Sequence, residues 1–293
     1  MGKGLAIETS GRVGSVAAFL DGRLLAEETF EHGLANAARL VVTMDALCRQ
    51  QGWRPGDVNE LYISIGPGSF TGLRLAVTVA KTMWLATGVR IVAVPSVRVL
   101  ACNAPPEATN LIVVLDAKRG QVFTARFESH GGPICVTPIS PSPCTQGEDR
   151  GGGSSVLVDP SIPLAATPLD PHPNPPPGYK GRGQVGSMEI VEAAHLDTLS
   201  AMLARSPRPV WLLGEGLDYH RPEIPVASDV IVTDQSLWRA RAAAVGELGT
   251  QMAAAGQWAD AMTLSPLYIR PPEAEEKADA RAAAELAARE APK

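Results

Sequence analysis

A glycine-rich stretch joins two segments of different character in this chain. It reads Gly66-Pro67-Gly68-Ser69-Phe70-Thr71-Gly72-Leu73-Arg74. Residues 60–65 before it form an apolar run that predicts a strand, and the mostly apolar residues after it, to about Thr87, predict a helix. Glycines let the backbone turn tightly and approach another group closely, and Ser69 or Thr71 can cap the helix. The stretch therefore predicts the strand-loop-helix unit of an α/β protein.

Two interpretations of this loop remain open. Free N–H groups and the positive end of the helix suit an anion, and Arg74 in the first turn opposes the helix dipole unless an acid or a phosphate faces it. A phosphate or nucleotide loop would use Gly66, Gly68, Ser69, Thr71, Gly72 and Arg74. The alternative is a tight turn with no ligand. No Gly-Lys-Ser/Thr follows, so P-loop ATPase chemistry is not expected here.

The helix predicted after the loop is apolar around most of its circumference. Its polar side chains crowd into one arc about 100° wide. A helix laid on one face of a sheet needs much less apolar surface, so this helix is covered either by helices of its own chain or by a partner. The helix predicted at about 34–50 is its neighbour in either case. The candidate interface residues are Leu34, Leu40, Val41, Met44, Leu47, Leu73, Val77, Ala80 and Trp84.

The rest of the chain divides into two similar halves. Further strands are predicted at 5–9, 15–20, 23–30, 89–94, 111–115, 121–127 and 210–213, and further helices from Ser96 and at about 189–205 and 237–255. In each half an apolar strand ends in an acid, Glu8 or Asp116, and a short turn with Arg and Gly leads into a second strand. This weak internal repeat is the layout of an actin-like (ASKHA) α/β fold with two lobes, each a mixed sheet with helices.

The boundaries of these halves follow from composition. We expect an N-terminal lobe at 1–108, a C-terminal lobe at 109–270 and a charged tail at 271–293. Proline and glycine are concentrated between about 140 and 186. Such a segment cannot bury enough apolar surface to offset its ordering entropy, so we expect a disordered or extended insertion in the second lobe.

Composition narrows the classes of function. The net charge is −5, which argues against nucleic-acid binding through a large basic patch on this chain alone. No run of about 20 apolar residues predicts a membrane span. The start of the chain runs directly into a strand without a signal-peptide pattern. Because no signal-peptide pattern is present, we expect the four separated cysteines to be reduced thiols and the protein to be cytoplasmic.

Catalytic motifs are weak. Glu8 and Asp116 stand where acids of actin-like kinases manage magnesium, so a stand-alone small-molecule kinase is an alternative, although both following loops depart from the usual phosphate loop. No two of the five histidines are three to five residues apart, and no His-Glu-x-x-His occurs, so we expect no metal site and no metallopeptidase. No Gly-x-Ser-x-Gly elbow marks a serine nucleophile. We assign no catalytic residue.

Four pieces of the chain together resemble the TsaB (YeaZ) family of bacterial proteins. They are residues 5–10, where the family usually has Asp at position 8, residues 66–74, residues 116–122, and Pro266-Leu267-Tyr268-Ile269-Arg270. The resemblance covers about 1–130 and 189–270. The insertion and the tail after Pro271 depart from the family, and neither touches the N-terminal lobe.

The resemblance implies a function. A TsaB-like protein is a non-catalytic scaffold in the transfer of threonylcarbamoyl from threonylcarbamoyl-AMP to N6 of the adenosine next to the anticodon, in tRNAs that read codons starting with A. It would pair through its N-terminal helices with a larger, metal-binding catalytic paralogue (TsaD), and a P-loop ATPase (TsaE) would join the pair. Transfer RNA would be met only through the complex, where ATP or ADP could act. A homodimer through the same face stays open.

Overall fold

The computed structural model describes residues 2–31, 36–129 and 188–270. Apolar and alternating runs at the start of the chain form an antiparallel meander, in which Asp21 and Gly22 adopt left-handed conformations and turn the chain between its second and third strands. Two further strands add in parallel on the other side of the first. The sheet order is β3-β2-β1-β4-β5, from β1 (Lys3–Glu8), β2 (Val13–Leu20), β3 (Arg23–Glu31), β4 (Glu60–Ser64) and β5 (Arg90–Val94).

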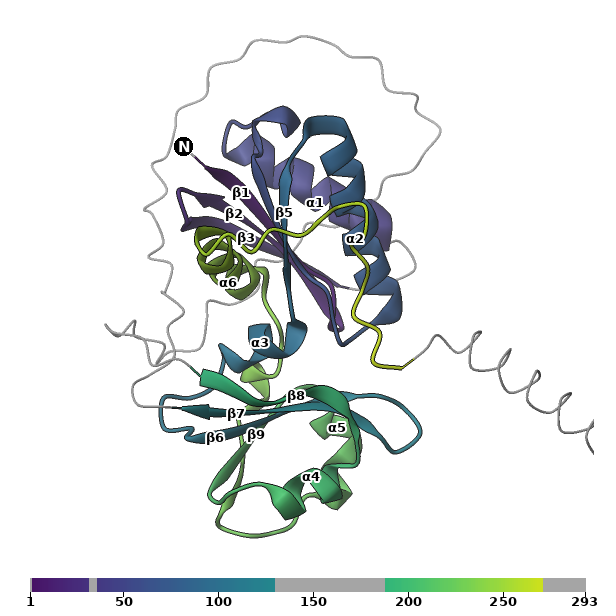
Figure 1. The fold of residues 1–293 in the computed structure, drawn as a ribbon, viewed down its shortest axis with the longest axis vertical. Coiled ribbons are helices and arrows are strands. Elements are labelled where there is room, and N and C mark those ends of the chain that lie inside the picture. Colours follow the sequence, from purple (N-terminus) through teal and green to yellow (C-terminus); the bar gives the residue numbers. More distant parts are fainter. Residues whose placement is uncertain (1, 32–35, 130–187, 271–293) are drawn as a thin grey trace, which may run out of the picture.

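Helices cover both faces of this first sheet (Figure 1). On one face, α1 (Asn36–Gln50) and α2 (Phe70–Thr87) share a core with the sheet, in which Leu40 and Ala76 are fully buried. On the other face lies α6 (Ala242–Ala254), packed against β1, β2, β4 and β5. Its first turn is held by the Ser15 hydroxyl and the Glu27 carboxylate, which accept from the N–H groups of Ala242 and Ala243.

The second sheet repeats the first. Its order is β10-β9-β6-β7-β8, from β6 (Asn110–Asp116), β7 (Val122–Ser129), β8 (Met188–Asp197), β9 (Val210–Leu213) and β10 (Val230–Val232). Again the first three strands form an antiparallel meander, and the last two add in parallel beside the first. The predicted two-lobed α/β fold with mixed sheets is confirmed, and the weak repeat in the sequence corresponds to a repeated topology.

Short helices complete the second lobe and join it to the first. They are α3 (Ser96–Ala101), α4 (Leu199–Arg205) and α5 (Leu217–His220), with 3₁₀ turns at Arg221–Glu223 and Gln235–Leu237. A further 3₁₀ turn, Pro55–Asp57, precedes β4 in the first lobe. The core of this lobe contains the whole apolar run of β6, together with Leu199 and Met202 of α4. No helix within the described ranges is both long enough and apolar enough to span a membrane.

One predicted helix is wrong. Residues 188–197 form strand β8 rather than the start of a helix at 189–205, and only Leu199–Arg205 are helical. The segment is rich in Glu, Ala and Leu, which favour helices, but its alternating Met188 and Ile190 pack on the second core while β7 supplies the backbone partners. Tertiary pairing at the edge of a sheet thus overrides local propensity.

The C-terminal part of the described chain returns to the first lobe. After β10 the chain leaves the second sheet, forms α6 on the first sheet, and continues past β5 and α2 (Figure 1). Ala259 bridges Ile91 of β5, and Ala261 and Leu264 are buried in the core beneath α2. The sequence-based division, which gives all of 109–270 to the second lobe, differs here because a helix can complete a sheet formed much earlier in the chain.

The predicted insertion at about 140–186 and the predicted charged tail at 271–293 lie outside the described residues. Cys135 and Cys144 also lie there, whereas Cys48 and Cys102 are buried free thiols.

Glycines in α6 generate a stability prediction. A Cβ added at Gly246 would lie 2.0 Å from the Phe19 ring, so the helix can approach the sheet closely only because this residue has no side chain. We expect Gly246→Ala to lower the free energy of unfolding by about 1–3 kcal/mol through overpacking, despite the roughly 1 kcal/mol that Ala gains over Gly in a helix. Urea denaturation measures the change.

The matched control is Gly56→Ala. Nothing lies within 4 Å of a Cβ added at Gly56, and its φ is not left-handed. We expect this substitution to be neutral or slightly stabilising. A gain in stability for Gly246→Ala would contradict the close packing of α6 on the sheet.

Candidate functional site

The Gly66–Arg74 loop is docked on the turn that follows β1. The Ser69 N–H donates to the Ser10 carbonyl at 2.7 Å, and a Cβ at Gly68 would lie 2.5 Å from the same oxygen. A Cβ at Gly72 would lie 1.9 Å from the Thr9 carbonyl oxygen, and the Thr9 hydroxyl donates to the Gly72 carbonyl at 2.8 Å. The glycines are therefore explained by contact with the chain's own backbone.

The loop also caps α2. The Ser69 hydroxyl accepts from the Gly72 N–H at 3.3 Å, as the sequence predicts for one of its two capping candidates. The structure brings all six predicted loop residues together: Gly66 and Gly72 are buried, Gly68 and Ser69 half-buried, and Thr71 and Arg74 exposed. Phosphate or nucleotide binding by this loop stays a prediction.

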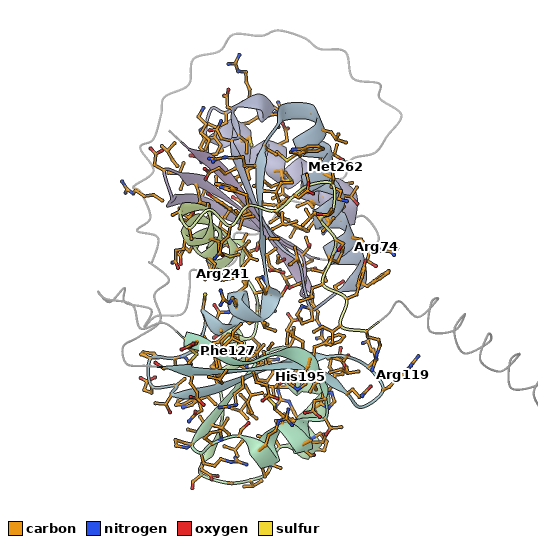
Figure 2. The ribbon with its side chains drawn as sticks, in the orientation of Figure 1. Arg74, Arg119, Phe127, His195, Arg241 and Met262 are labelled. Carbon is orange, nitrogen blue, oxygen red and sulfur yellow. The ribbon has the colours of Figure 1, made fainter. Side chains whose placement is uncertain are left out.

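Among the described residues, Arg74 faces two aromatic side chains, Tyr268 of the C-terminal segment and Phe70 of its own helix. Its Nε donates to the Tyr268 hydroxyl at 3.0 Å, and its guanidinium carbon lies 4.0 Å from the centre of the Phe70 ring. Phe70 and Tyr268 rings are 5.3 Å apart between centroids. A cation in the first turn of a helix is thus supported by an aromatic pair, an arrangement that the sequence did not reveal because Tyr268 is distant in the chain (Figure 2 shows Arg74 at the edge of the molecule).

Most of the predicted interface residues belong to the core of this chain. Leu34 lies outside the described residues, and Trp84 is half-buried. Six are buried beneath the helices: Leu40, Met44, Leu47, Leu73, Val77 and Ala80. The C-terminal segment of the chain covers part of the apolar surface of α2, because Ala261 and Leu264 belong to the core that α2 shares with the sheet.

Three large aliphatic side chains of α1 and α2 are exposed to solvent. Val41 is 54% exposed, Val42 67% and Leu85 75%. The predicted polar arc of α2 also faces outward, since Thr71, Arg74, Thr78 and Thr82 are exposed. Of the eight predicted interface residues that the structure describes, only Val41 is exposed, and the sequence missed Val42 and Leu85. Helical periodicity identified the apolar side of α1, but that side packs on the sheet.

Glu8 sits at the junction of the lobes and is fully buried. Its Oε1 accepts from the Ser10 N–H, while Oε2 and the hydroxyl of Ser64, the last residue of β4, make no hydrogen bond with a described residue. Burial raises the pKa of Glu8, and the nearby Glu215 carboxylate raises it further against the lowering effect of Ser10. Such a group is neutral more readily than an exposed glutamate.

Asp116, the second predicted acid, contacts Lys118 in the turn that follows it. Burial raises its pKa, but the ammonium of Lys118 at 2.8 Å and the Lys118 N–H outweigh that effect, so the pKa of Asp116 is lowered overall. In the turn after Asp116, Lys118 and Arg119 have left-handed backbone conformations. Glu8 and Asp116 therefore end equivalent strands but differ in environment, one buried and the other ion-paired.

Side chains bridge the two lobes beside these acids. The Arg12 backbone N–H donates to Glu215 at 3.3 Å, and the Arg12 guanidinium donates to the Tyr219 hydroxyl and stacks 5.0 Å from its ring. On the C-terminal segment, Arg270 donates to the Ala117 carbonyl and to Gln121. The loops at the junction of the two lobes are thus linked by the chain's own arginines.

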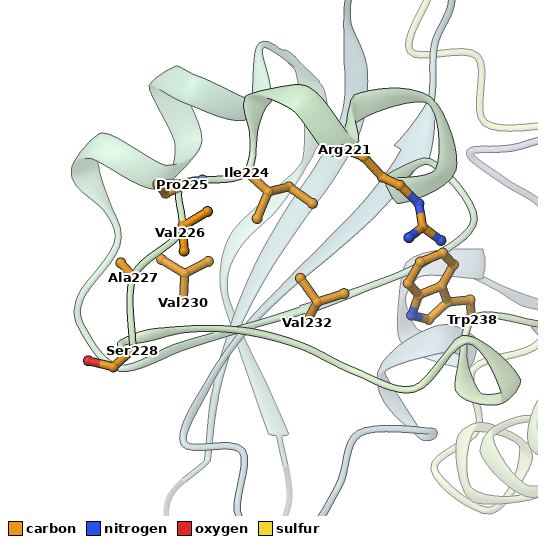
Figure 3. Close-up of a pocket in the computed structure, with 9 residues that line it drawn as sticks. All are labelled: Arg221, Ile224, Pro225, Val226, Ala227, Ser228, Val230, Val232 and Trp238. Carbon is orange, nitrogen blue, oxygen red and sulfur yellow. The ribbon is translucent and has the colours of Figure 1, made fainter.

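A separate apolar groove lies in the second lobe (Figure 3). It encloses about 610 Å³ between the 221–228 loop, β10 and Trp238, with Arg221 stacked 5.7 Å from the Trp238 ring. None of the predicted site residues lines it. Within residues 2–31, 36–129 and 188–270, no cluster of three or more His, Cys, Asp or Glu side chains is arranged to hold a metal ion.

Known proteins match both the sequence and the fold. A family model described as TsaD, tRNA N6-adenosine threonylcarbamoyltransferase, matches residues 35–135. The tRNA threonylcarbamoyladenosine biosynthesis protein TsaB of Bacillus subtilis is 30% identical over 128 residues, which are 44% of this chain and 56% of that protein. The Escherichia coli protein of the same name is 29% identical over 129 residues, 42% of this chain and 54% of its own length. The chain spans little more than half the length of these relatives.

Solved structures match over most of the chain. A Pseudomonas aeruginosa protein described as similar to the peptidase YEAZ has a TM-score of 0.62 at 20% identity, covering 92% of this chain and all of that one. YeaZ from Pseudomonas aeruginosa has a TM-score of 0.56 at 21% identity, with the same coverage. The repeated sheets and these neighbours define the class of fold as a two-lobed α/β protein with a mixed sheet in each lobe. The sequence matches to TsaB proteins, over less than half of this chain, support a relation to the TsaB/YeaZ family.

The buried Glu8 generates a prediction of pH dependence. Because its pKa is raised in the folded state, the folded protein keeps this proton at a pH where the unfolded chain has lost it. Glu8 therefore contributes stability below the unfolded pKa of about 4.5 and loses it as pH rises toward the raised folded value. Glu8→Gln cannot ionise, so its unfolding free energy should exceed that of the parent by an amount that grows above pH 4.5.

Urea denaturation at several pH values between about 4.5 and 8 measures this difference. Glu107→Gln, which removes an exposed carboxylate, is the control and should give a curve parallel to that of the parent. Parallel curves for Glu8→Gln as well would contradict a raised pKa at this position.

Proposed function

We propose that this chain is a subunit of the system that forms threonylcarbamoyladenosine on tRNA, and that it works by pairing with a TsaD-type catalytic subunit. The observation that carries the proposal is the exposure of three aliphatic side chains on the helices of the first lobe, Val41 and Val42 of α1 and Leu85 of α2. Such exposed aliphatic groups favour a protein interface. The relatives named for this pathway support the tRNA-modifying role.

The region matched by the TsaD family model supports the pairing surface. Residues 35–135 include the whole of α1 and α2, so a TsaD-type protein is expected to have a related helix layer. Two related layers can pack face to face with similar side chains on each side, as in a pseudo-symmetric dimer. The same argument permits a homodimer of this chain, which would then compete with the heteromer.

A scaffolding role fits the state of the loops between the lobes. A kinase would need Glu8 and Asp116 free to work with magnesium and a phosphate, but Glu8 is buried against Ser10 and Asp116 pairs with Lys118. The Gly66–Arg74 loop is likewise filled by contacts with Thr9 and Ser10. We therefore propose that this chain contributes no catalytic residue. The P-loop ATPase, ATP or ADP, and tRNA would act at the assembled complex.

The test is association with the TsaD-type protein encoded by the same genome. We expect Val42→Glu to weaken the complex at least a hundredfold, because a carboxylate would be buried without a partner at the interface. Isothermal titration calorimetry measures the dissociation constant. Val226→Glu is the matched control, since Val226 is an exposed valine of the second lobe and its substitution should leave binding unchanged.

Three results would decide against the proposal. The first is that the parent chain and the TsaD-type protein do not associate. The second is that Val42→Glu binds as tightly as the parent. The third is turnover of a nucleotide with a small metabolite by the pure isolated chain, which would favour the kinase alternative. Reconstitution of threonylcarbamoyl transfer to tRNA, with and without this chain, tests the pathway itself.

A further inference from the structure

Arg74 and Arg90 of the first lobe lie at the same distance from an aromatic ring, but only Arg90 is paired with a described acid. Arg90 lies 4.0 Å from the Trp258 ring and pairs with Glu60 at 2.6 Å. Arg74 lies 4.0 Å from the Phe70 ring and forms no ion pair with any described residue. Arg74 is therefore a stacked guanidinium on the surface whose charge is not neutralised by the described part of the chain.

The position of Arg74 is fixed by the C-terminal segment. Tyr268 accepts from Nε, which leaves the two terminal nitrogens without a hydrogen-bond partner among the described residues. Tyr268 is itself held in place because the neighbouring Leu267 N–H donates to the Ile65 carbonyl at 2.7 Å. A guanidinium that is stacked on one ring and hydrogen-bonded to the hydroxyl of another residue loses less rotamer entropy on binding than a free one.

Arg74 belongs to the surface through which the chain is proposed to pair. It lies on the exposed stripe of α2, between Thr71 and Thr78, and the same stripe ends at Leu85. Phe70 and Tyr268, both more than one-third exposed, enlarge this end of the surface. Tyr and Arg are the residue types that most often dominate the binding energy of protein interfaces.

We propose that Arg74, held by Phe70 and Tyr268, binds a carboxylate of the TsaD-type partner and anchors the complex at the N-terminal end of α2. This inference rests on the proposed function. The terminal nitrogens of an arginine match the two oxygens of a carboxylate in a bidentate pair. A protein carboxylate is favoured over an RNA phosphate, because RNA is held by several cations together, whereas the exposed neighbours along the stripe are threonines.

Affinity measurements test the anchor. With the full chain and the TsaD-type protein, we expect Arg74→Gln to raise the dissociation constant about tenfold, which corresponds to about 1.4 kcal/mol. Arg74→Lys should cost less, because it keeps the charge but loses the planar fork. Added salt should weaken the parent complex more than the Arg74→Gln complex. A Glu→Arg or Asp→Arg scan of the partner should identify one substitution that restores binding to Arg74→Glu.

Arg221→Gln is the matched control. Arg221 is also an exposed arginine stacked on an aromatic ring, but it lies in the second lobe and pairs with Asp218. Its removal should leave the dissociation constant unchanged. Circular dichroism and the melting temperature show whether each variant is folded.

The outcomes separate the anchor from the function that it serves. If Val42→Glu abolishes the complex but Arg74→Gln binds like the parent, the anchor is wrong and the proposed function stands. If the parent chain does not bind the TsaD-type protein, both are wrong. Unchanged protein binding with weakened tRNA binding by the complex would make phosphate the ligand. If joint neutralisation of Glu273, Glu275 and Glu276 has the same effect as Arg74→Gln, the tail supplies the carboxylate, and the anchor is again wrong.

Discussion

The contact between Gly72 and Thr9 places the most important helix of the first lobe. A methyl group at position 72 would come within 1.9 Å of the Thr9 carbonyl oxygen, so α2 can begin where it does only with glycine there. The Thr9 hydroxyl and the Ser10 carbonyl then bind the same loop. These contacts join the end of β1 to the start of α2. They therefore fix the position of α2, and of Arg74 in its first turns, relative to the sheet.

The second lobe uses the same device with different residues. After β9, a Cβ at Gly214 would lie 2.2 Å from the Val114 carbonyl oxygen, and the Gly216 N–H donates to that oxygen at 3.0 Å. In each lobe, therefore, a glycine-containing loop after the fourth strand docks on the end of the first strand. The intervening residue Glu215 is thereby directed toward Arg12 of the other lobe. The repeat of topology extends to the turn that positions the interlobe residues.

Sequence reasoning identified local structure better than long-range partners. The loop, its serine cap, the N-terminal meander and the strand pair at 111–127 depend on neighbours in the chain, and these predictions are confirmed. Strand β8 was missed because its partner β7 decides its conformation against the preference of its own residues. The apolar stripe of α1 was identified, but periodicity alone does not say whether a stripe packs on a sheet or on another protein. Leu40 and Leu47 pack on the sheet, whereas Val41 and Val42 do not.

The same limit explains why the sequence predicts an acid or a phosphate beside Arg74. In the sequence it is a cation that opposes the dipole of its helix, and a nearby anion is the simplest compensation. In the structure, the Arg74 guanidinium is instead supported by the Tyr268 hydroxyl, 194 residues away in the chain, and by the face of the Phe70 ring. These contacts orient the guanidinium without neutralising it. The C-terminal segment that provides Tyr268 also carries Arg270 to the second lobe, so one segment holds the lobes together and fixes the exposed charge. A surface held in this way has little conformational freedom to lose on association, so it would bind a partner at a small entropic cost.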